Sequence, residues 1–290
     1  MASVVDDNMV EGNEGDNVNE KVTYKPKYTD KELNSFIDGI RDAGEKMREW
    51  NPSYYMIPLQ RGLPLFDILT MLDLDIDPDL AFYFPASGKI KDSKKVLTNC
   101  YENFLLEKQD EEIERCPISS IDEVVGGHSV EKTFNAYTAA CKNVVRHNLR
   151  RNNMDPISRL IDEETEYLKN KFPLRVFGIK DTRNLKRMSE KYKDNLNIGN
   201  ILEFPVDKII TMDDMDYGLI EFKHLESSGS NDGVYYPGVK NILRSEAYEN
   251  LLKDIAKRIG TDHEKIQLER SRIISDSNTY SKKPEYDFDK

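Results

Sequence analysis

Residues 116–130, which read CPISSIDEVVGGHSV, decide the fold of the first half of the chain. The stretch reads as a buried strand over residues 118–121, two acids, a tight Gly126-Gly127 turn and a helix opened by the hydroxyl of Ser129. Glycines let a backbone approach an anion closely, and the free N–H groups at the start of a helix attract negative charge. The stretch therefore predicts a phosphate-binding loop between a strand and a helix.

Two adjacent acids, Asp122 and Glu123, follow the strand directly. Carboxylates do not bind phosphate, but they accept hydrogen bonds from sugar hydroxyls and hold Mg2+ through water. An exposed strand end is the alternative interpretation of the pair. Acids at the strand end and amides at the helix start together favour a phosphorylated sugar as the ligand.

A similar strand, turn and helix lie upstream. Residues 54–58 predict a short buried strand, Leu59 to Gly62 a turn, and residues 63–72 an apolar helix with Pro64 in its first turn. Residues 80–84 predict the next strand. The turn holds Arg61 beside a glycine at the end of this strand, and a solvated Arg61 is one interpretation of the pattern.

The remaining elements follow from spacing and capping signals. Thr29 and Glu32 form a capping box that predicts a helix to about Glu49. Residues 97–114 are ambiguous, and we favour a strand followed by a polar turn or helix. The other predicted elements are helices over 129–145 and 156–170, strands over 174–179 and 206–212, an edge strand over 217–224, and a helix capped by Ser245 and ended by Gly260.

Strands alternate with helices through much of the chain, which predicts an α/β fold with a mainly parallel sheet covered on both faces. Ligands of such sheets bind at the carboxyl ends of the strands, near a topological switch point. The 59–62 turn and the 122–129 loop both follow strands. We expect them to share one site.

Composition bounds the function. The chain has 290 residues and a net charge of −11, of which residues 1–20 supply six acids and no Lys or Arg. Length allows one large α/β domain or two small ones, and we expect a disordered acidic segment over 1–22, one α/β domain over 23–270 and a polar tail over 271–290.

The acidity of the chain argues against general nucleic-acid binding. Neither a membrane span nor a secretory signal is evident, so we expect a cytoplasmic protein.

The arrangement resembles the type I phosphoribosyltransferases. The fingerprint of that family is a strand, two acids, two apolar residues, a short loop rich in Gly and Thr or Ser, and a helix, which here corresponds to residues 118–129. The family also places a pyrophosphate-binding turn after its first core strand, and residues 56–65 are similar to it. The resemblance covers roughly Thr29 to Lys180.

The resemblance implies that the protein binds phosphoribosyl pyrophosphate with Mg2+ and transfers the phosphoribosyl group to or from a nitrogenous base. Asp122 and Glu123 would hold the ribose hydroxyls and the metal, and with Arg61 they would form the catalytic set. Lys180, at a strand end, would contact the base. The implied ligand-binding residues are Gln60, Arg61, Gly62, Asp122, Glu123, Gly126, Gly127, His128 and Ser129.

Three departures from the family pattern keep other functions open. The loop is about one position shorter than the common form, lacks its threonine before glycine, and has His128 where the family has a small or variable residue. Divergent members occur in microbial conflict and stress systems. The alternatives are a non-catalytic sensor of phosphoribosyl pyrophosphate or a nucleotide, and a nucleotide-targeting effector in antiviral defence; either could act as a homodimer or in a larger complex.

Two basic stretches have a structural and a functional interpretation. Residues 146–151 form a cluster at the end of a predicted helix, where they would interact with the helix dipole or bind an anion. Lys89, Lys91, Lys94 and Lys95 lie in a predicted loop over residues 87–95, which is either solvated or a mobile cover for the site.

Overall fold

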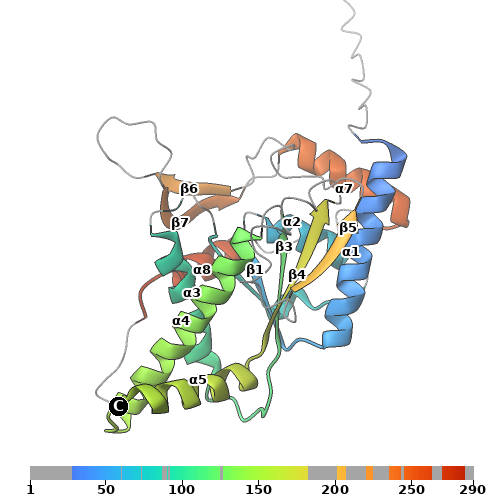
Figure 1. The fold of residues 1–290 in the computed structure, drawn as a ribbon. Helices are drawn as coiled ribbons and strands as arrows, with labels where there is room; N and C mark the ends of the chain where they lie inside the picture. The colour runs from blue at the N-terminus through green and yellow to red at the C-terminus, as the bar shows by residue number, and fades with distance from the viewer. Residues whose placement is uncertain are drawn as a thin grey trace, which may run out of the picture.

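The protein is an α/β fold built on a parallel sheet with helices on both sides (Figure 1). Five strands in the order β2-β1-β3-β4-β5 form the sheet, and every neighbouring pair is parallel. The strands are β1 (Tyr54–Pro58), β2 (Ala81–Phe84), β3 (Ile118–Glu123), β4 (Leu174–Asp181) and β5 (Ile201–Val206). The computed structural model describes residues 28–59, 61–72, 74–86, 90, 92–124, 127–181, 201–206, 220–224, 235–242, 245–262 and 270–284.

Helices cover the sheet in two layers (Figure 1). One layer holds α1 (Asp30–Trp50), α2 (Gly62–Met71) and α7 (Glu246–Ile259), and the other holds α3 (Ser93–Lys108), α4 (His128–Arg151) and α5 (Ser158–Lys171). A short 3-10 turn, η1 (Pro78–Leu80), leads into β2. Strands buried on both faces explain why β1 and β3 read as continuous buried runs, without the alternation of a half-exposed sheet.

The capping signals predicted the ends of two helices correctly. Thr29 and Glu32 form the capping box of α1, and Ser245 caps α7 through the N–H group of Tyr248. Gly260 ends α7 in the left-handed conformation, with φ of 72°. The apolar positions of α1 that repeat at helical spacing are all buried, namely Leu33, Phe36, Ile37, Ile40 and Met47.

Two predictions in the middle of the chain were wrong. Residues 97–114, for which a strand was favoured, belong largely to helix α3. Because α3 begins at Ser93, Lys94 and Lys95 lie in its first turn and not in a loop. The helix is packed by α4 on one side and by the C-terminal helix on another, so its buried positions do not form one stripe.

The C-terminal part also departs from the prediction. Residues 220–224 form β6 (Ile220–His224), which pairs with β7 (Tyr235–Ile242) in a separate antiparallel hairpin and not with the main sheet. Residues 271–290 were expected to be a polar tail, but helix α8 (Arg270–Tyr280) packs against β2 and β7. The side chains of Ile273 and Ser277 are buried there.

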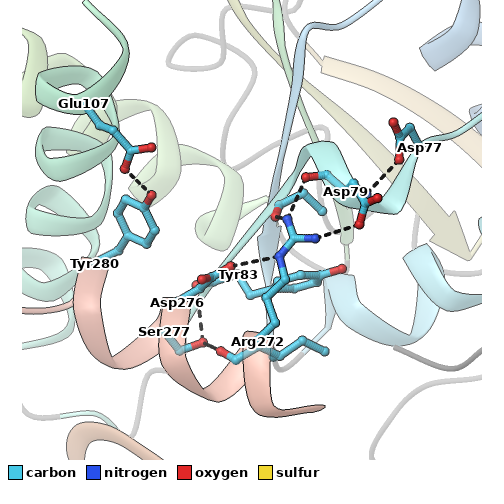
Figure 2. Close-up of polar contacts among 10 residues, drawn as sticks. Asp77, Asp79, Tyr83, Glu107, Arg272, Asp276, Ser277 and Tyr280 are labelled. Carbon is cyan, nitrogen blue, oxygen red and sulfur yellow. Dashed lines mark hydrogen bonds and ion pairs between the residues drawn. The ribbon is translucent and has the colours of Figure 1, made fainter. Parts of the chain in front are cut away.

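Polar contacts hold α8 against the edge of the sheet (Figure 2). Arg272 donates hydrogen bonds to the backbone oxygens of Asp79 and Ala81, at 2.6 and 3.0 Å, and to the Asp79 carboxylate at 3.0 Å. Ser277 donates to the backbone oxygen of Tyr83 at 3.2 Å, and Tyr280 donates to Glu107. The helix therefore covers β2, which is the outer strand of the sheet and would otherwise offer an open edge.

Several predictions fall outside the described residues: the disordered segment over 1–22, the site residues Gln60 and Gly126, the loop lysines Lys89 and Lys91, and all of the 206–212 strand except Val206, with which β5 ends. In the described ranges, no helix is both long enough and apolar enough to cross a membrane.

Candidate functional site

The strand order places a topological switch point between β1 and β3. From β1 the chain continues through α2 to β2 on one side, while β3 lies on the other side of β1. The connections that leave β1 and β3 therefore run to opposite layers, into α2 and α4. In open α/β sheets, ligands bind in a crevice outside the carboxyl ends of strands that diverge in this way. Both predicted loops begin at the carboxyl ends of these two strands.

Gly62 packs the start of α2 closely against strand β3, just before the acid pair. A Cβ atom at this position would lie 2.5 Å from the backbone oxygen of Ile121 and 2.6 Å from Cδ of Pro58. Real Cβ atoms do not approach other atoms so closely, so only glycine fits here without a shift of the backbone. The start of α2 is therefore packed against the end of β3, as close backbone approach in a shared site requires.

The acid pair lies at the very end of β3. Asp122 and Glu123 are its last two residues and are 7% and 4% exposed, so the exposed-strand-end interpretation is wrong. Successive residues of a strand point to opposite faces, so the two side chains leave β3 on opposite faces of the sheet. The backbone N–H group of Glu123 donates to the Asp122 carboxylate at 2.9 Å, which fixes that side chain.

The Asp122 carboxylate is buried, and its neighbours offset only part of the cost of burying its charge. Burial raises its pKa to about 6, while a hydrogen bond with Ser129, the positive charge of Arg61 and the Glu123 N–H group lower it. Removing the carboxylate from water therefore costs more than these partners return. The interaction with Arg61 shows that the structure brings together a cation and an acid that are 61 positions apart in the sequence.

The loop after β3 opens α4 in a different way from the prediction. The helix begins at His128, and its N-cap is the buried Gly127, which has a φ of 70° and makes no side-chain cap. Ser129 was expected to cap the helix, but its hydroxyl instead contacts Asp122. The exposed His128 ring lies 3.8 Å from the Glu131 carboxylate. The N–H groups of the first turn of α4 therefore have no capping side chain in competition with an anion.

A small apolar cluster fixes the loop beneath the site. Val124, the residue after the acid pair, packs with Val130 of the first turn of α4 and with Val176 of β4. The backbone N–H group of Val124 also donates to the backbone oxygen of Ile179 at 2.9 Å. The last residue before the loop and the first turn of α4 after it are thus both packed against β4.

Arg61 is the half-buried N-cap residue of α2. It makes no hydrogen bond or ion pair with another described residue, although its charge acts on Asp122. A guanidinium group at the mouth of a crevice, without a carboxylate partner of its own, can pair with an anionic ligand.

Lys180 lies one residue before the end of β4 and is 3% exposed. Asp122 pairs with Gly178 in the register of β3 and β4, and Lys180 is two residues beyond Gly178 on the same strand. Residues two apart in a strand share a face, so Lys180 and Asp122 lie on the same face of the sheet. The structure therefore places the predicted base-contacting lysine beside the predicted sugar-binding acid.

The described residues could hold Mg2+ only together with a phosphorylated ligand. Among them, no three His, Cys, Asp or Glu side chains gather into a group that could hold a metal ion. Asp122 and Glu123 supply two carboxylates at most. Mg2+ commonly uses one or two carboxylates together with water and substrate phosphates, so the pair suits an ion that arrives with a phosphorylated ligand.

Cations from both basic stretches of the sequence form a second polar feature. Arg146 and Arg150, from the cluster that followed the predicted helix, line a cavity together with Lys94 and Lys95 of α3. No spacing rule links α3 and α4 in the sequence, because their approach is fixed only by the fold.

Comparisons of the chain with models of known protein families, with curated proteins and with solved structures gave no match.

Proposed function

We propose that the protein binds phosphoribosyl pyrophosphate in the crevice between β1 and β3 and transfers the phosphoribosyl group to or from a nitrogenous base. One observation carries the proposal. The acid pair, Arg61 and the glycine-opened start of α4 converge at the switch point of the sheet, although they come from two separate stretches of sequence.

Each group has a role that follows from its chemistry. The first-turn N–H groups of α4 would bind the 5′-phosphate, and Asp122 and Glu123 would accept hydrogen bonds from the ribose hydroxyls. Arg61 would pair with the pyrophosphate. Lys180 would donate a hydrogen bond to the base. This division separates the two charged ends of the substrate between the start of α2 and the start of α4, and Gly62 packs the first of these against β3.

The reaction would exchange one bond at the anomeric carbon. The bond from C1′ to pyrophosphate oxygen breaks with its electron pair on pyrophosphate, and a nitrogen of the base forms the new bond and releases its proton. The side chains act by positioning the reactants and by stabilising charge on the leaving group. Mg2+, held by the substrate phosphates with Asp122 and Glu123, would neutralise part of that charge.

The experiment is pyrophosphate release by the wild-type protein and by Arg61→Ala with a panel of purine and pyrimidine bases. In an enzyme, Arg61 acts on the charge that develops on pyrophosphate, so the substitution should lower turnover about 10- to 1,000-fold and affect substrate affinity much less. Arg41→Ala, which removes a cation from an exposed ion pair on α1, is the matched control and should change neither quantity.

The same variants separate an enzyme from a sensor. A sensor would release no pyrophosphate with any base, and Arg61→Ala would weaken ligand binding by about 1.5 to 3 kcal/mol, as expected for a hydrogen bond to a charged group. If neither turnover nor binding responds to Arg61→Ala, the 59–62 turn is an ordinary connection and the proposal fails.

A further inference from the structure

A second cavity, of about 820 Å³, lies between α3, α4 and the chain that follows α8. Its walls come from residues 90–102, residues 143–150, and Lys283 with Pro284. Within α4, the nearest of these residues to the switch-point site is Asn143, which is 15 positions after His128. Because a helix rises 1.5 Å per residue, the α4 wall begins about 22 Å from the start of that helix. The α4 wall of the cavity is therefore distant from the start of α4, where the proposed phosphate loop lies.

The walls are strongly basic in an acidic protein. Five cations line the cavity, namely Lys94, Lys95, Arg146, Arg150 and Lys283, against two acids, Asp92 and Glu102. The chain as a whole carries a net charge of −11, so this concentration of positive charge runs against its composition. Cations gathered around one hollow repel one another unless an anion occupies it.

The acids in the wall offset only part of this charge. None of the five cations forms an ion pair with another described residue. Glu102 is buried and accepts a hydrogen bond from Asn143 at 2.9 Å; burial raises its pKa, while this hydrogen bond and the positive charge of Lys283 lower it. Glu102 therefore offsets part of the charge of Lys283, and five cations still face two acids across the cavity.

The type and spacing of the cations indicate phosphate. Arg146 and Arg150 are four positions apart on α4, so they are neighbours on one face at about 5–6 Å between Cβ atoms. Guanidinium groups match phosphate oxygens with two parallel hydrogen bonds, and adjacent groups suit adjacent phosphates. Among the described lining residues there is no Phe, Tyr or Trp, and the one imidazole, that of His147, is buried, so a broad stacking surface for a base is missing from this part of the wall.

We propose that this cavity is a second anion site, which binds a small ligand with two or more linked phosphates. Recognition rests on the phosphate chain and not on a base, and it is independent of the switch-point site. Arg146 and Arg150 supply the paired contacts, and Lys94, Lys95 and Lys283 surround the remaining charge.

The test is titration of the full chain with inorganic tripolyphosphate in buffer with a chelator and no Mg2+. We expect one bound equivalent in the wild type, and at least about ten-fold weaker binding in the double variant Arg146→Gln with Arg150→Gln. Arg151→Gln removes the same charge from an exposed neighbour that does not line the cavity, and it should bind as the wild type does. Asp122→Asn with Glu123→Gln should also bind normally.

Four outcomes would overturn the proposal. The first is no binding by a wild type that melts normally, and the second is equal weakening by Arg151→Gln, which would indicate only surface charge. The third is binding that appears only after residues 1–20 are deleted, because the acidic segment would then be the occupant. The fourth is tighter binding of a single-stranded oligonucleotide than of tripolyphosphate, lost in the same double variant, which would make the cavity a nucleic-acid site.

Discussion

At the scale of single residues, Asp122 carries a conflict between stability and binding. Its carboxylate is buried at the end of β3, and its pKa of about 6 shows that the folded protein disfavours the charged form. A ligand that donates hydroxyl hydrogen bonds would relieve this cost. Sites that are destabilised in the free protein and satisfied by a ligand are typical of functional residues.

Asp122→Asn should therefore stabilise the free protein while weakening ligand binding. The pKa rises from 3.8 to about 6 on folding, so the folded state takes up a proton that the unfolded chain lacks between these values. The stability from this proton is full below pH 3.8 and is lost as the pH rises through 6. The variant should exceed the wild type by about 2 to 3 kcal/mol at pH 7, and by about 0.5 kcal/mol near pH 4.

Urea unfolding of both proteins at several pH values measures this difference. Asp155→Asn, at an exposed position between α4 and α5, is the control and should show no pH-dependent gain. A variant of Asp122 that is less stable than the wild type at pH 7 would show that the carboxylate is a structural group.

Gly62→Ala tests the contact between the two loops. The added Cβ atom would meet the backbone oxygen of Ile121 at 2.5 Å, so the loops must separate, at a cost of about 1 to 3 kcal/mol. Ligand binding should weaken as well, because the two halves of the site move apart. Thermal unfolding and ligand titration of the same variant give the two quantities.

Gly260→Ala is a matched control, since the added atom meets nothing within 4 Å and only its positive φ is strained. That change should cost about 1 to 2 kcal/mol and leave ligand binding intact. Equal effects of the two variants on binding would mean that the Gly62 contact does not shape the site.

At the scale of elements, local signals predicted some helices and strands well and others poorly. Features made by nearby residues can be predicted from the sequence. Examples are the capping box of α1, the buried run of β1 and the acids that end β3. Helix α3 is buried on more than one side, and its apolar residues do not form one stripe. Helix α8 has few apolar residues and depends on partners about 190 positions away.

Arg272→Ala should destabilise the protein although Arg272 lies in a segment that reads as a tail. The change removes three hydrogen bonds, which go to Asp79, just before β2, and to Ala81, its first residue. It also removes an ion pair with Asp276 at 3.7 Å. We expect a loss of about 1 to 3 kcal/mol in the free energy of unfolding, because two backbone oxygens lose their donor.

Arg159→Ala provides the comparison, since that side chain is 87% exposed and pairs only with Glu163 on its own helix. Its loss should cost less than about 0.5 kcal/mol. Chemical denaturation distinguishes the two cases, and an equally small effect of Arg272→Ala would mean that α8 is not needed to cover the sheet edge.

At the scale of the whole molecule, strand order decides which loops meet. The sequence predicts a loop site after β1 and another after β3. No local pattern predicts that these two strands are neighbours in the sheet, as the structure shows them to be. Only the fold places Arg61 near Asp122, turns Ser129 from a cap into a partner of Asp122, and makes one cavity wall of residues from α3 and α4. Contacts of this kind depend on tertiary packing and leave no local pattern.

The most direct test of the central claim is calorimetric titration with phosphoribosyl pyrophosphate in the presence and absence of Mg2+. We predict binding by the wild type that strengthens with Mg2+, and its loss in Asp122→Asn with Glu123→Gln, while Arg146→Gln with Arg150→Gln retains it. The bound ligand should also add about 2.7 kcal/mol of apparent stability at 100 times its dissociation constant. Absence of binding at millimolar ligand, or equal binding by the acid-pair variant, would contradict a phosphoribosyl site between β1 and β3.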